Sequence, residues 1–147
     1  MPDILHKVRV NHASKDATYK ALTTLDGLSG WWTTDTTGDS RAGGVVKFRF
    51  GDGGFDMEVL EADPGGRLRW LVVDGPQEWI GTTIDWALKE DENGTVVLFK
   101  HQDWKEPVEF MHHCSTKWAM FLMSLKALVE TGEGAPFPRD VKVDGFH

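Results

Sequence analysis

Apolar and polar residues alternate along most of the chain, which predicts a series of β-strands. In residues 4–12, Ile4, Val8 and Val10 fall on one face and charged or polar residues on the other, as in a half-buried strand. Five further segments with one apolar face are separated by Gly-, Asp- and Asn-containing turns, and cover residues 45–50, 55–59, 68–72, 79–89 and 95–103. Such a run predicts an antiparallel meander with one buried face.

Helical periodicity appears first after the opening strand. Ser14 fits a helix N-cap, and Asp16 lies in the first turn, where the helix dipole favours a negative charge. We expect this helix to stop near residues 26–27 and a short helical turn to cover residues 28–32. Residues 33–44 are rich in Thr, Asp, Gly and Ser, so a loop is predicted there.

A second, longer helix is predicted near the end of the chain. Ser115 is the expected cap, Thr131 the approximate end and Gly132 the C-terminal stop. Its apolar residues recur at helical spacing and must be buried against the rest of the fold. They are Trp118, Phe121, Leu122, Leu125, Leu128 and Val129. Residues 133–147 are broken by Pro and Gly, and we expect them to lie on the surface.

The order of these elements predicts an α+β fold. A twisted, one-sided sheet buries its apolar face most simply by curling around the long helix. We therefore expect a sheet of six or seven strands around the C-terminal helix, with two short helices after the first strand. One domain over residues 1–147, with a core at about 4–132, accounts for the length.

Composition restricts the function. The net charge is −7, which argues against nucleic-acid binding because phosphates need a basic face. Cys114 is the single cysteine, so no internal disulfide can form. The N-terminus lacks the apolar run of a signal peptide, and no stretch reaches the roughly 18 apolar residues of a membrane span. A cytoplasmic protein without membrane insertion is predicted.

Two segments carry a family resemblance. Residues 21–32, ALTTLDGLSGWW, end in a Trp pair, and residues 118–134 run from Trp118 to LKALVETGEG. With the element order, they resemble the START-like or SRPBCC superfamily, which has the helix-grip fold of the birch-pollen allergen. The closer likeness is to the subgroup named after the activator of heat-shock protein 90 ATPase, over about residues 4–138. This resemblance implies a cavity between sheet and helix, but no single activity.

A helix-grip cavity would be lined by inward strand positions and by the long helix. Seven tryptophans against one tyrosine supply apolar area for such walls. If Phe99 points inward, His101 does too, and an inward His can bind a polar group or transfer a proton; His12 is a weaker candidate of this kind. The predicted ligand-binding residues are Trp32, Phe48, Phe50, Phe55, Met57, Trp70, Trp86, Phe99, His101, Trp118 and Leu122.

Other chemistry is poorly supported. His112, His113 and Cys114 are adjacent and point in different directions, so they do not form a metal-binding set. Cys114 lacks the base and orienting group of a nucleophile. Gly51, Gly53 and Gly54 lie in a hairpin rather than before a helix, which excludes a phosphate loop. We predict no catalytic residue, metal or other cofactor.

Three functions remain. The first is binding of a small hydrophobic or amphipathic ligand, with a stress-related role implied by the subgroup. The second is an enzyme, of the cyclase, hydrolase or lyase type, that uses His101. The third is a co-chaperone that stimulates the heat-shock protein 90 ATPase. The eukaryotic activators have a separate N-terminal chaperone-binding domain, and we expect this chain to lack it, which makes the third function doubtful. The sequence leaves a homodimer open.

Overall fold

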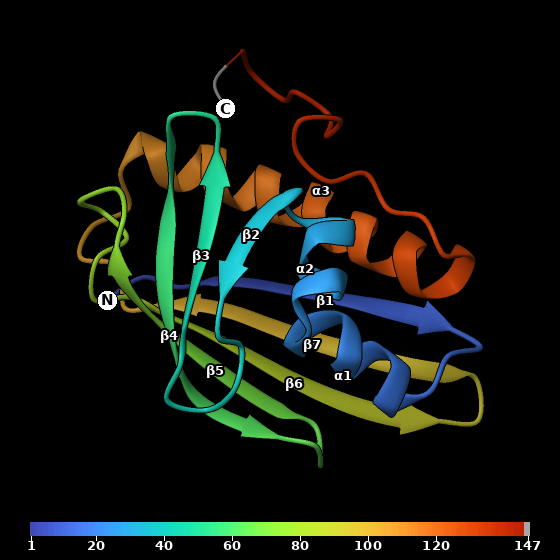
Figure 1. The fold of residues 1–147 in the computed structure, drawn as a ribbon. Coiled ribbons are helices and arrows are strands. Elements are labelled where there is room, and N and C mark those ends of the chain that lie inside the picture. Colours follow the sequence, from blue (N-terminus) through green and yellow to red (C-terminus); the bar gives the residue numbers. More distant parts are fainter. Residues whose placement is uncertain (146–147) are drawn as a thin grey trace.

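Seven antiparallel strands form one open sheet that bends around a long helix in the computed structural model, which describes residues 1–145 (Figure 1). The strand order is β1-β7-β6-β5-β4-β3-β2. The elements are β1 (Ile4–Asn11), α1 (Lys15–Thr23), α2 (Leu25–Trp31), β2 (Asp35–Gly38), β3 (Val45–Phe50), β4 (Gly53–Asp63), β5 (Arg67–Asp74), β6 (Thr83–Asp91), β7 (Gly94–Gln102) and α3 (Glu109–Thr131). The predicted α+β helix-grip architecture is confirmed.

The period-2 pattern places large side chains on the inner face of the sheet. Trp86 on β6 lies opposite Phe99 on β7, and Ile84 lies opposite His101. All four side chains are buried. Because successive strand residues point to opposite faces, the polar residues between them face outward.

The N-terminal helices begin at side-chain caps. Ser14 accepts a hydrogen bond from the Ala17 N–H at 3.0 Å, as its N-cap position predicts. Thr24 does the same for α2 through the Gly27 N–H. The second helix therefore begins at Leu25, three residues earlier than the expected start of a helical turn at residue 28.

Two further predictions are wrong, the start of the long helix and the loop at residues 33–44. Helix α3 begins at Glu109, with Val108 in the N-cap position, so Ser115 lies inside the helix and not at its cap. The added turns are supported by Phe110 and Met111, which pack against the core. Residues 35–38, expected to be part of a loop, form the edge strand β2 because they pair with β3. The stop at Gly132 is confirmed by its left-handed conformation, φ 89°.

Helix α3 also covers the edge of the sheet formed by β1. The Lys126 ammonium donates to the Arg9 carbonyl on β1, and the Glu130 carboxylate accepts the Asn11 N–H at 2.7 Å. An edge strand leaves backbone groups without partners, and these side chains supply them. The grip on β1 is therefore polar as well as apolar.

The segment after α3 was expected to lie on the surface, but the structure packs part of it against the helix (Figure 1). Ser124 in α3 donates to the Trp31 carbonyl at 2.8 Å and accepts the Ala135 N–H at 2.7 Å. Further along, the Phe137 N–H donates to the Trp32 carbonyl at 2.8 Å, and Asp140 is buried. This segment closes one side of the pocket described next.

Candidate ligand-binding pocket

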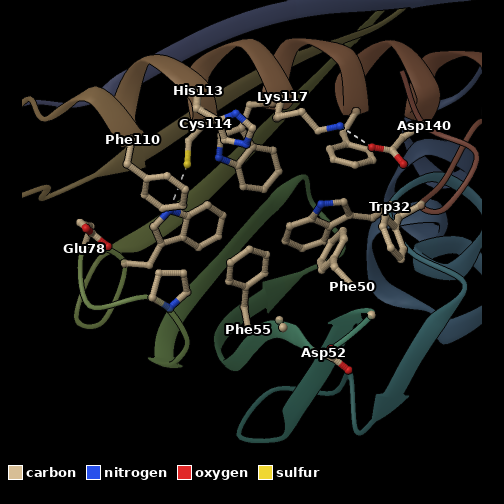
Figure 2. Close-up of a pocket in the computed structure, with 18 residues that line it drawn as sticks. Trp32, Phe50, Asp52, Phe55, Glu78, Phe110, His113, Cys114, Lys117 and Asp140 are labelled. Atoms are coloured by element: carbon tan, nitrogen blue, oxygen red, sulfur yellow. Dashed lines mark hydrogen bonds and ion pairs between the residues drawn. The ribbon is translucent and has the colours of Figure 1, made fainter. Parts of the chain in front are cut away.

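A pocket of about 670 Å³ opens between α3 and the sheet (Figure 2). Its walls come from α3, the β3–β4 hairpin, the loop before β6 and the C-terminal segment. Pockets for small organic molecules have volumes of roughly 300–1,000 Å³. The space is therefore large enough for a ligand of several rings or a short acyl chain.

Aromatic rings form most of the wall. The Phe55 and Trp79 rings stack with centroids 4.0 Å apart, and Trp79 in turn stacks on Trp118 at 5.9 Å. On the other side Trp32 stacks on Phe55, also at 5.9 Å. The planes differ by 9°, 13° and 19° respectively. The stacked rings make a continuous apolar wall, which favours apolar ligand groups.

The predicted binding residues divide into two groups. Four of them line the pocket: Trp32, Phe50, Phe55 and Trp118. The other seven lie in the core and outside the pocket lining: Phe48, Met57, Trp70, Trp86, Phe99, His101 and Leu122. Strand parity correctly placed six of these inward and helical spacing placed Leu122, but large side chains fill the middle of the sheet. The pocket lies at the end of the sheet near the β3–β4 hairpin.

His101 is held in the core by two hydrogen bonds, one at each ring nitrogen. Its Nδ1 accepts the indole N–H of Trp118 at 3.1 Å. An indole only donates, so Nδ1 carries no proton and Nε2–H donates to the Thr82 hydroxyl at 2.8 Å. That hydroxyl donates to the Trp79 carbonyl at 2.6 Å. Burial lowers the pKa of His101 to about 3, so the imidazole is neutral and both its nitrogens are occupied.

Several lining residues were missed by sequence reasoning. Trp79, Phe110 and Phe137 come from the ends of elements or from loops, where no periodicity marks an inward position. Lys117 had a usable signal, because it lies four residues before Phe121 on the apolar stripe of α3. A lysine on such a face needs a partner.

The partner of Lys117 is Asp140 from the C-terminal segment, as Figure 2 shows. The Lys117 ammonium also donates to the Val141 carbonyl at 2.9 Å and lies 4.8 Å from the centre of the Phe121 ring. Lys142 contacts the second Asp140 oxygen at 2.7 Å. Burial acts to raise the pKa of the Asp140 carboxyl, but hydrogen bonds from the two lysines outweigh it, so the pKa lies below its usual value.

Two further ionisable side chains line the pocket on α3. The His113 ring lies with Nδ1 2.8 Å from the Asp144 carboxylate. Cys114 accepts the indole N–H of Trp79 at 3.4 Å, and burial raises the pKa of its thiol to about 12. The thiol is therefore protonated at neutral pH and a poor nucleophile. Within residues 1–145, no three His, Cys, Asp or Glu side chains come together as a metal site.

Comparison with known proteins identifies relatives. The family described as "Activator of Hsp90 ATPase homolog 1-like protein" matches residues 12–130. The solution structure of the Aha1 dimer from Colwellia psychrerythraea is 43% identical, with 91% of this chain and 100% of that chain covered and a TM-score of 0.83. A search of curated proteins returns no match.

More distant structures share the fold. The protein SSP2350 from Staphylococcus saprophyticus is 18% identical over 90% of this chain and 95% of its own, with a TM-score of 0.75. CalU16 from Micromonospora echinospora is 20% identical over 99% of this chain and 75% of its own, with a TM-score of 0.79. None of the helices described in residues 1–145 has the length and apolar character of a membrane span.

Proposed function

The chain belongs to the family of activator of Hsp90 ATPase homolog 1-like proteins, and we propose that it binds a small apolar or amphipathic molecule in the pocket between α3 and the sheet. The observation that carries this proposal is the pocket itself, with about 670 Å³ of space and aromatic walls. A well-formed apolar pocket with a few polar groups is the ordinary form of a small-molecule site.

Area burial would supply most of the affinity. Covering about 200–300 Å² of apolar ligand surface at about 25 cal/mol per Å² gives a gross 5–7 kcal/mol. Loss of translational and rotational freedom reduces that figure on association. Affinities in the micromolar range require about 8 kcal/mol of net free energy, so a natural ligand must add polar contacts or bury more area.

The ionisable groups favour binding over turnover. His101, the residue on which an enzymatic function was based, has a hydrogen-bond partner at each nitrogen and lies outside the pocket lining. Cys114 lines the pocket, but its thiol is protonated at neutral pH because its pKa is about 12. A general base or nucleophile must instead be free to take or release a proton near neutral pH.

The test is ligand screening against a variant whose pocket is filled. Gly53 lines the pocket, lies opposite Phe50 and has open space where a side chain would begin. Gly53→Trp should therefore fill the pocket while the fold is kept. Glu92→Trp, in the exposed turn after β6, adds the same residue away from the pocket and is the matched control.

Fatty acids, sterols and polycyclic aromatics would be screened by thermal shift and by quenching of tryptophan fluorescence. We expect at least one class to stabilise the native chain and Glu92→Trp but not Gly53→Trp. The proposal would be refuted if no class of compound stabilised the native chain. It would also be refuted if Gly53→Trp bound the same compounds as tightly as the native chain.

A second candidate is stimulation of a heat-shock protein 90 ATPase, favoured by the 43% identity to an Aha1 protein. Adding the purified chain to such a chaperone should then raise its rate of ATP hydrolysis. The same relative is a dimer, so we also propose a homodimer, which sedimentation velocity would detect as a species of twice the monomer mass.

A further inference from the structure

A buried ion pair lies at one end of the pocket. The side chains of Lys117 and Asp140 are only 9% and 4% exposed, and both belong to the pocket lining, in which aromatic residues predominate. Burial of two charges costs free energy that packing with apolar residues would avoid. A buried charged pair in the wall of the pocket is therefore a candidate for recognising a ligand.

The charge around this pair is positive. Lys142 holds the second oxygen of Asp140, so two ammonium groups face one carboxylate. The acidic lining residues Asp52 and Glu78 are exposed and come from the β3–β4 hairpin and the loop before β6, away from the ion pair (Figure 2). The Asp144 carboxylate lies against the lining residue His113, one helical turn before Lys117. An anion entering the pocket is therefore attracted to the end where Lys117 lies.

The Lys117 ammonium has three N–H donors. Asp140 and the Val141 carbonyl accept from it, and the face of the Phe121 ring lies 4.8 Å away. With its contacts already satisfied, the ammonium can take a new anion only by giving one up. Asp140 can give up its contact with Lys117 and still keep a positively charged partner, because Lys142 also contacts its carboxylate.

We propose that the pocket selects an amphipathic ligand with one carboxylate, which replaces Asp140 as the partner of Lys117 while the apolar body lies against the aromatic wall. This inference rests on the proposed function of the pocket. A neutral ligand would leave the ion pair intact, whereas a cationic ligand would meet two lysines. The net positive charge of Lys117, Lys142 and Asp140 taken together thus separates an anionic ligand such as a carboxylate from neutral and cationic amphipathic molecules.

The test compares two fluorescent probes with the same ring system, 2-anthracenecarboxylate and 2-anthracenemethanol. The native chain should bind the carboxylate about tenfold more tightly, as expected for a hydrogen bond between charged groups. Lys117→Met should remove this preference with little effect on the alcohol. Lys20→Met, which breaks the exposed pair with Asp16 on α1, is the control and should keep it.

Asp140→Asn gives an independent measurement should Lys117→Met fail to fold. It removes the competing anion but keeps the shape of the side chain, so carboxylate binding should strengthen several-fold while the alcohol is unaffected. Unchanged or weaker carboxylate binding by Asp140→Asn would overturn the exchange.

The possible failures are distinguishable. If the native chain binds both probes equally, the pocket binds ligands as proposed and the carboxylate preference is wrong. The preference is likewise wrong if a folded Lys117→Met retains it. If neither probe binds and the wider screen also finds no ligand, the proposed function itself fails.

Discussion

Replacing His101 by Gln should remove much of the acid sensitivity of this fold. The imidazole is buried and neutral, held between the Trp118 indole and the Thr82 hydroxyl, with a pKa of about 3. In the unfolded chain the pKa of His returns to about 6.5. Gln retains one donor and one acceptor but does not titrate, so it separates the protonation effect from loss of the hydrogen bonds.

The size of the effect follows from linkage. Well above pH 6.5 neither state holds the proton, and His101 contributes no pH dependence. Between pH 6.5 and 3 the unfolded chain binds a proton that the native chain does not, so the free energy of unfolding falls as pH falls. Each pH unit is worth about 1.4 kcal/mol. From pH 7 to pH 5 the loss attributable to His101 is therefore about 2 kcal/mol.

Urea unfolding followed by far-UV circular dichroism at pH 7, 6 and 5 would measure this loss. The native chain should lose about 2 kcal/mol more than His101→Gln over this range, although the variant starts less stable because it loses ring contacts. Contributions from the other titrating groups cancel in the comparison. Equal losses in the two proteins would refute the buried, neutral state of His101. Imidazole nitrogen shifts in NMR should show the proton on Nε2.

Two further substitutions test how the ends of the fold are held. Ser124→Ala should lower the free energy of unfolding by about 1–3 kcal/mol, because the Trp31 carbonyl and the Ala135 N–H lose their common partner; faster hydrogen exchange at Ala135 would identify the site. Gly94→Ala should cost about 2 kcal/mol or more, since φ is 142° and a Cβ would lie 2.1 Å from a carbonyl oxygen of β1. Gly53→Ala, with open space at the same position, should be nearly neutral, and urea midpoints would compare the two.

The sequence determined the elements whose pattern is local. Alternation placed Phe48, Trp86 and Phe99 on the inner face, and the structure buries all three. Ser14 and Gly132 marked a helix start and a helix end correctly, because caps satisfy backbone groups within one turn. The start of α3 could not be predicted in this way, since its first turns are supported by packing of Phe110 against the core, which includes the Trp104 ring, and not by a side-chain cap.

Only the tertiary structure decided where the inward side chains leave space. Strand parity predicts an inward side chain for both His101 and Phe50, yet His101 is buried in the core and Phe50 lines the pocket. The difference arises because tryptophans fill the centre of the sheet, whereas loops and the C-terminal segment enclose its open end. Lys117 and Asp140 form an ion pair although they are 23 residues apart, and Asp140 lies in the C-terminal segment, which has no periodic pattern. Periodicity reports which way a side chain points, and packing between distant segments decides what it meets.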